Sequence, residues 1–300
     1  MKWKDRTPRE YYSRYEKINI ENNQEWFEVY RLPGDVFAIC EPQHFQEVNS
    51  YLVIGQDRSL LFDTGMGICD IKAVVRQLYQ GEIVAVNSHF HFDHIGDNHR
   101  FDFVHIFDDP YAKAIAENGL PKEGLGNQLD EAMFLFDYPK GFEPDQFKIP
   151  PYKTKLIHDA YRFDLGNRSL EVIHTPGHSN DSIMVYENKN KILFTGDTFY
   201  LGALYAHFDC DEFGKSNIEN YYQTMNGLPE RCPDVKALYC SHNDFIVDPI
   251  KISETASALK DIMNSCADTE TETNTGHTYL EDGTKLREYG FNGFSIIVKN

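Results

Sequence analysis

The chain has 300 residues, enough for one large domain or two small ones, and its hydrophobic fraction of 41% supplies a substantial buried core. Its 47 acidic and 29 basic residues give a net charge of −18, which repels phosphate backbones and argues against a nucleic-acid partner. We find no apolar stretch of the roughly 18 residues that a membrane span needs, no leader-like apolar run after the charged start, and six scattered cysteines without CxxC spacing, so we expect a cytoplasmic protein with reduced thiols and no membrane partner.

The first half of the chain is polar at its start and then becomes rich in short apolar segments. Residues 1–24 are polar and carry several tyrosines, and we expect an extension that packs on the body, joins a homodimer contact or lines a pocket. Alternating or continuous apolar residues between turn signals predict strands at 27–32, 36–40, 50–55, 59–63, 82–86 and 103–107. Helical spacing predicts helices over 70–80 and 109–117.

A segment rich in histidine follows directly after the strand predicted at 82–86. Its sequence is NSHFHFDHIGD, and within six positions it holds His89, His91, Asp93 and His94. Imidazole nitrogens and carboxylate oxygens are the ligands of zinc and similar divalent metals. Four such groups exceed what one catalytic zinc takes from protein while keeping a position open for water. The segment therefore suggests two metals.

The regular rhythm breaks after this region and then resumes. Residues from about 119 to 157 are rich in proline and contain a helix-like stretch at 127–136, which indicates an insertion that either caps the core or forms a lid over the substrate. The second half predicts strands at 160–164, 169–173, 182–186, 191–194 and 235–240, helices at 216–228 and 252–263, and a strand-like tail over about 266–300 that ends in a strand at 295–299. Two similar strand-rich halves with flanking helices favour two sheets packed face to face in a single domain, residues 1–300.

Three more candidate ligands lie in loops directly after predicted strands. They are His178, Asp197 and His242, and small or turn-forming residues around each one permit the backbone to approach a metal closely. His174 lies four residues before His178, and we do not expect it to be a ligand. His207 lies close enough to the Asp197 loop to line a pocket.

The HxHxDH segment and these later loops together resemble the metallo-β-lactamase superfamily, over about residues 26 to 265. The resemblance implies an α/β fold, the αββα sandwich of two mixed β-sheets flanked by helices, with a site at one edge. It also implies two divalent metal ions, zinc with iron or manganese as alternatives. One ion would be held by His89, His91 and His178. The other would be held by Asp93, His94 and His242, with Asp197 bridging both and Asp63 orienting the ligand loop.

The bridging Asp197 separates branches of this superfamily. True metallo-β-lactamases usually lack it, whereas lactonases, glyoxalase II and RNase Z have it. The short strand-like tail differs from the helical glutathione-binding extension of glyoxalase II, and the charge of −18 disfavours RNase Z. Tyr200 resembles a tyrosine that contacts the substrate carbonyl in acyl-homoserine-lactone lactonases, although it could equally be a packed aromatic residue.

The sequence therefore predicts a hydrolase for a small-molecule carbonyl substrate, which is an ester, a lactone or a thioester. A bridging hydroxide would attack the carbonyl carbon, Tyr200 would stabilise the oxyanion, and Asp93 would hand a proton to the leaving group. The alternatives with the same fold are a persulfide dioxygenase with a single iron and a phosphodiesterase. A non-catalytic binding module is disfavoured because all seven ligand positions are filled.

Overall fold

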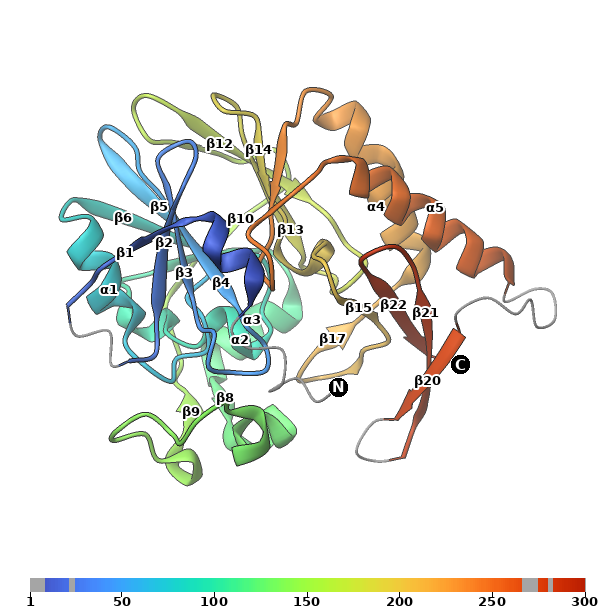
Figure 1. Ribbon diagram of the computed structural model, residues 1–300, viewed down its shortest axis with the longest axis horizontal. Helices are drawn as coiled ribbons and strands as arrows, with labels where there is room; N and C mark the ends of the chain where they lie inside the picture. Colours follow the sequence, from blue (N-terminus) through green and yellow to red (C-terminus); the bar gives the residue numbers. More distant parts are fainter. Residues whose placement is uncertain (1–8, 22–24, 266–274, 280–282, 300) are drawn as a thin grey trace. The chain divides into compact units, whose positions relative to one another are not determined.

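The computed structural model describes residues 9–21, 25–265, 275–279 and 283–299 (Figure 1). Parts of the predicted extension (1–24) and of the predicted tail (266–300) therefore lie outside the described residues. The chain divides into two compact units. The first comprises the residues up to 157 together with 163–170, and the second comprises residues 158–162 and those from 171 onward. Each unit contains a mixed β-sheet and helices, in agreement with the two strand-rich halves of the sequence.

The first unit contains an eight-stranded sheet with the order β1-β2-β3-β4-β5-β6-β7-β10. Neighbouring strands are antiparallel from β1 to β5 and parallel from β5 to β10. The strands are β1 (Glu16–Ile18), β2 (Glu28–Leu32), β3 (Val36–Cys40), β4 (Asn49–Val53), β5 (Arg58–Phe62), β6 (Glu82–Val86), β7 (Val104–Phe107) and β10 (Thr154–Ile157). Parallel neighbours need crossover connections, and these contain α1 (Ile71–Leu78), α2 (Phe92–Ile95), η3 (Asn98–Arg100) and α3 (Pro110–Asn118).

Local sequence explains why α1 forms where the apolar spacing predicts it. The Asp70 side chain caps the helix by accepting a hydrogen bond of 3.0 Å from the backbone N–H of Ala73. Ile71, Val74 and Val75 are buried, so the helix presents one apolar face to the core.

The described part of the N-terminal extension joins the first unit. The single turn η2 (Glu10–Arg14) leads into β1, which pairs antiparallel with β2. Tyr12 is buried and its ring stacks on that of Tyr30, with 5.4 Å between the ring centroids. The Tyr11 hydroxyl donates to Glu47 at 2.7 Å, and the Arg9 guanidinium donates to the same carboxylate. Of the three roles that the sequence leaves open, the described residues show two, because they pack on the body and also line a pocket with Glu28 and Tyr30.

The helix expected at 127–136 is absent, and this prediction was wrong. Two 3-10 segments, η4 (Lys122–Leu129) and η5 (Glu131–Met133), stand there instead, and Gly126 interrupts the first of them with φ of 55°. The apolar stretch pairs with a distant part of the chain instead, because Phe134 forms an antiparallel bridge to His44. The rest of the segment contains β8 (Leu120–Pro121), η6 (Pro144–Gln146) and β9 (Lys148–Ile149), and β8 pairs with β9.

A six-stranded sheet, whose residues belong to the second unit except for 163, 164, 169 and 170, has the order β11-β12-β13-β14-β18-β19. It is mixed, because β14 runs parallel to β18 and antiparallel to β13. A second sheet has the order β15-β22-β21-β20. The described strands from β11 onward are β11 (Arg162–Asp164), β12 (Ser169–His174), β13 (Ile183–Glu187), β14 (Ile192–Phe194), β15 (Ala203–Ala206), β16 (Asp209–Cys210), β17 (Gly214–Lys215), β18 (Ala237–Tyr239), β19 (Ile246–Val247), β20 (Thr275–Tyr279), β21 (Lys285–Gly290) and β22 (Ser295–Lys299). The described helices of the second unit are η7 (Gly196–Thr198), α4 (Ile218–Arg231) and α5 (Ile250–Ser265).

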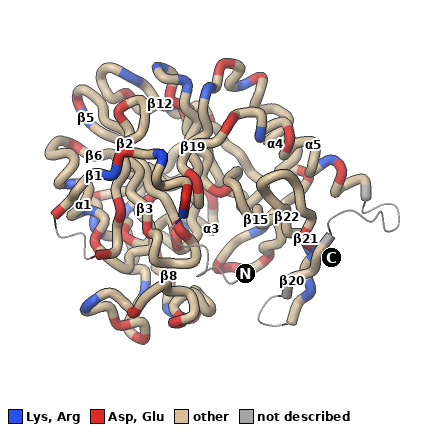
Figure 2. The backbone as a smooth tube through the Cα atoms, in the orientation of Figure 1, with Lys and Arg blue, Asp and Glu red and all other residues tan. Residues whose placement is uncertain are grey.

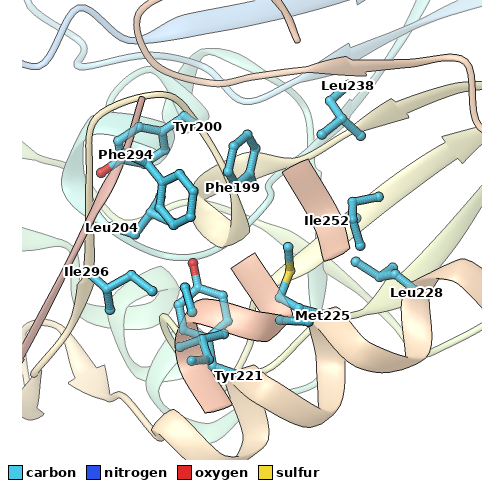
Figure 3. Close-up of a cluster of buried hydrophobic side chains, with 14 of the residues drawn as sticks. Phe199, Tyr200, Leu204, Tyr221, Met225, Leu228, Leu238, Ile252, Phe294 and Ile296 are labelled. Atoms are coloured by element: carbon cyan, nitrogen blue, oxygen red, sulfur yellow. The ribbon is translucent and has the colours of Figure 1, made fainter. Parts of the chain in front are cut away.

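The predicted strand at 295–299 is confirmed as β22, which pairs parallel with β15. Figure 3 shows Phe294 and Ile296 close to Leu204 and to Tyr221 of α4, within one buried hydrophobic cluster. Phe294 and the strand β22 of the tail are therefore part of the core of the second unit.

Charged residues are distributed along the whole described backbone, and Figure 2 shows the basic segments interspersed among acidic ones. Within the described residues, the helices are too short or too polar to cross a lipid bilayer.

Candidate metal centre

The four candidate ligands of the histidine-rich segment converge in the first unit. The segment leaves β6 at Val86 in an extended conformation and then turns through the one-turn helix α2. His89, His91, Asp93 and His94 are each at most 4% exposed. The ring of His89 lies 4.4 Å from that of His91 and 4.3 Å from that of His94, measured between centroids. The turn at α2 therefore brings together side chains that are up to five positions apart in sequence.

Asp63 orients this cluster from the end of β5. Its carboxylate accepts a hydrogen bond of 2.6 Å from the backbone N–H of Ser88 and one of 2.9 Å from Nδ1 of His94. Because Nδ1 carries the proton, Nε2 of His94 presents a lone pair, and it lies 3.6 Å from Oδ2 of Asp93. The hydroxyl of Ser88 lies 2.9 Å from Nδ1 of His89. Asp63 thus has the orienting contact that the family resemblance implies.

The other three candidate ligands converge in the second unit, each in the loop after a strand. His178 follows β12, Asp197 lies in η7 after β14, and His242 follows β18. Nε2 of His178 lies 3.7 Å from Oδ2 of Asp197, and Nε2 of His242 lies 3.0 Å from Oδ1 of the same carboxylate. Nδ1 of His178 donates to the carbonyl oxygen of Tyr205 at 2.8 Å.

The donor chemistry of both clusters fits a divalent cation. In each unit an imidazole donates its Nδ1–H away from the cluster and presents Nε2 to a carboxylate oxygen, as His94 does to Asp93 and His178 does to Asp197. Two lone pairs that face each other repel, and a cation between them turns that repulsion into coordination. Histidine and carboxylate ligands suit zinc, iron and manganese.

The remaining histidines near the motifs are engaged elsewhere or stand apart. Nε2 of His174 lies 2.8 Å from the carbonyl oxygen of Asn180, which agrees with its expected exclusion from the ligands. His207 is 7% exposed and packs against Phe208 with 4.4 Å between ring centroids. Burial, together with the nearby His178, lowers the pKa of His207 to about 4, so its imidazole is neutral at physiological pH.

Tyr200 is a packed residue whose hydroxyl is already engaged. It is 6% exposed, its hydroxyl donates to the carbonyl oxygen of Ala203 at 2.5 Å, and its ring lies 4.7 Å from that of His242. Figure 3 shows it beside Phe199 and Phe294 in the hydrophobic cluster. Its ring therefore packs against His242. Its hydroxyl would have to break the hydrogen bond to Ala203 before it could donate to a substrate.

Sequence reasoning missed one buried acid beside the first cluster. Glu41, at the end of β3, is 1% exposed and accepts hydrogen bonds from Nε1 of Trp26 and from the backbone N–H of Met66. Burial raises its pKa to about 8, although both hydrogen bonds oppose that shift. In the sequence it is one glutamate after an apolar strand, and no motif surrounds it.

Comparison with known proteins identifies the family. A model described as "Metallo-beta-lactamase superfamily" matches residues 45–212, which is more than half of the chain. The human "Acyl-coenzyme A thioesterase MBLAC2" is 29% identical over 230 residues, covering 69% of this chain and 76% of that protein. The "Glyoxylase B2" of Dictyostelium discoideum is 26% identical over 157 residues, covering 52% of this chain and 48% of its own.

Solved structures show the same fold. A metallo-β-lactamase from Pontibacter korlensis matches with a TM-score of 0.56 and 18% identity, covering 78% of this chain and 99% of that one. The sec-alkylsulfatase Pisa1 from Pseudomonas sp. matches with a TM-score of 0.59 and 15% identity, covering 82% of this chain and 45% of that one. The predicted αββα fold class is thereby confirmed. The chain belongs to the metallo-β-lactamase superfamily, has its fold, and is a metal-binding hydrolase.

Proposed function

We propose that the chain is a thioester hydrolase with a dinuclear metal centre. The observation that carries this proposal is the similarity to acyl-coenzyme A thioesterase MBLAC2, which extends over 69% of the chain. Among the ester, lactone and thioester expected from the sequence, this similarity favours the thioester. The two clusters of histidine and carboxylate support the metal part of the proposal, because each has donors of the kind that zinc prefers.

The proposed ligands divide by metal position. His89, His91 and His178 would hold one ion, Asp93, His94 and His242 would hold the other, and Asp197 would bridge both. Zinc is the proposed metal. When bound, two such ions supply a nucleophile derived from water at neutral pH and polarise the substrate carbonyl.

One residue of the chain would transfer the proton that hydrolysis releases. Asp93, 4% exposed, would accept a proton and deliver it to the leaving group. A thiol with a pKa of about 8.5 leaves readily as a thiolate near neutral pH, so this step is less demanding for a thioester than for an oxygen ester. We therefore expect thioesters to be cleaved faster than the matching oxygen esters.

A substrate panel tests this function. Purified protein should bind two zinc ions per chain and hydrolyse acyl-coenzyme A and an acyl thioester of N-acetylcysteamine faster than the oxygen ester of the same acid. The uncharged thioester belongs in the panel because the net charge of −18 opposes the phosphates of coenzyme A. Thiol release and elemental analysis are the measurements. One iron per chain with no thioester turnover, or faster cleavage of a phosphodiester, would overturn the proposal.

Tyr200 is proposed to donate to the oxyanion by exchanging its Ala203 acceptor for the substrate oxygen. Tyr200→Phe keeps the ring that packs on His242 and removes only the hydroxyl. We expect kcat for a thioester to fall by about 10- to 100-fold while two metals remain bound, because one oxyanion donor is lost. Steady-state kinetics with metal analysis check this. An unchanged kcat would limit Tyr200 to packing.

A further inference from the structure

Glu41 bridges two parts of the first unit that are far apart in sequence. Its Oε2 accepts a hydrogen bond of 2.6 Å from Nε1 of Trp26, and its Oε1 accepts one of 2.9 Å from the backbone N–H of Met66. The carboxylate is 1% exposed, so the surrounding protein rather than water satisfies it. Each of the two oxygens of the Glu41 side chain faces an N–H donor, so the loss of either acceptor would leave a buried N–H group without its partner.

One of those bonds fixes the loop that carries Asp63. The loop runs from Asp63 to Gly67 and lies against the His94 segment through backbone hydrogen bonds. The Thr64 N–H donates to the His94 carbonyl at 2.9 Å, and the Gly96 N–H donates to the Gly65 carbonyl at 2.8 Å. The carboxylate of Asp63 then holds Nδ1 of His94. A series of hydrogen bonds therefore joins the loop that carries Met66 to the ring of His94.

The other bond connects Glu41 to the segment at 120–149. The Trp26 ring lies 5.8 Å from that of the fully buried Phe134, measured between centroids. Phe134 also packs edge-on against His44, at 5.0 Å between ring centroids. Backbone hydrogen bonds join the same regions, from the Leu135 N–H to the Gln43 carbonyl at 2.8 Å and from the Phe45 N–H to the Met133 carbonyl at 2.9 Å.

From this continuous set of contacts we infer that Glu41 is a positioning residue that sets the metal affinity of the His94 side of the centre, and that the segment at 120–149 supports the centre through Trp26 and Glu41. The inference rests on the proposed role of His94 as a ligand. The segment at 120–149 would then hold the metal centre in place, a role that differs from capping the core and from closing over the substrate.

Glu41→Gln is the sharpest test, because it preserves size and removes one acceptor. The amide offers one oxygen and an NH2 group, so one of the two N–H donors faces another donor. Glu47→Gln is the matched control, because Glu47 is also 1% exposed and lies in the same loop. Its carboxylate bonds to Arg9 and Tyr11 of the N-terminal extension instead.

We expect Glu41→Gln to bind one of two zinc equivalents about 10- to 100-fold more weakly than the parent protein, as outer-shell changes at metal sites commonly do. Glu47→Gln should bind both with the parent affinity. Competition with a chelator measures the affinity, and the visible spectrum of the cobalt-substituted protein reports the ligand geometry. Parent affinity in a folded Glu41→Gln variant, or an equal loss in Glu47→Gln, would overturn the inference.

Trp26→Phe is a second test of the same series of contacts, for the case in which Glu41→Gln does not fold. It removes one donor to Glu41 and keeps a ring against Phe134, so zinc binding should weaken less than in Glu41→Gln but measurably. Unchanged affinity in folded Trp26→Phe would count against the relay. Because zinc titration needs no substrate, a failure to hydrolyse thioesters would refute the proposed function and leave this inference standing.

Discussion

Replacing Asp197 with alanine should lower kcat for thioester hydrolysis by roughly 1,000-fold or more and reduce the metal content of the purified protein. The Asp197 carboxylate is the group that both His178 and His242 face, at 3.7 Å and 3.0 Å. Its removal takes away the anion of this cluster and leaves two imidazoles with no carboxylate between them. Elemental analysis and thiol release measure the two effects.

Glu187→Gln is the matched control for this variant. Glu187 is a fully buried carboxylate in the same unit, and it accepts hydrogen bonds from the backbone N–H groups of Lys189 and Asn190 in the β13–β14 turn. Its replacement should lower stability while the metals and the turnover remain. Parent turnover by Asp197→Ala would refute the proposed centre.

Gly96→Ala should destabilise the protein by about 3 kcal/mol or more, although its backbone angles suit alanine. Gly96 has φ −54° and ψ −40°, which is right-handed helical conformation. The obstacle is space, because an added Cβ would overlap the backbone of Met66 and Gly67. The Asp63–Gly67 loop and the segment that carries His94 and Gly96 would have to separate, which would disturb the Asp63–His94 hydrogen bond. Zinc affinity should therefore fall as well. Urea unfolding and zinc titration check both effects.

Gly227→Ala provides the opposite expectation for the same substitution. Gly227 lies inside α4, and an added Cβ there meets nothing within 4 Å. The change should raise the free energy of unfolding by about 0.5–1 kcal/mol, because alanine loses less backbone entropy in a helix. If Gly96→Ala were as stable as the parent, the backbone contact between the two loops would not be tight.

The candidate ligands could be proposed from the sequence because their placement depends on local order. Ligands placed after strands reach one end of a sheet whatever the rest of the chain does, so His178 and His242 could be found from the strands that precede them. The helix at α1 was equally accessible, since Ile71, Val74 and Val75 share one face. How the seven side chains combine around two metals stays a prediction.

The contacts that support the ligands could not be predicted from local sequence patterns. Glu41 reaches Met66 across 25 positions, and no local pattern signals that partner. The failed helix at 127–136 has a similar cause, because Phe134, one of the apolar residues that favoured it, is buried and forms a bridge to His44, about 90 residues away. Long-range pairing outweighed local propensity there.

The pairing of β15 with β22 makes the order of protein synthesis relevant to metal loading. The carbonyl of Tyr205 holds His178, and Tyr205 lies on β15 opposite Ile297, about 90 residues later in the chain. At a translation rate of roughly 5–20 residues per second, that interval lasts about 5 to 20 seconds. His178 and Asp197 thus leave the ribosome well before the strand that completes their support. The ligand cluster of the second unit consequently reaches its final geometry, and becomes ready for metal, only after β22 has been synthesised.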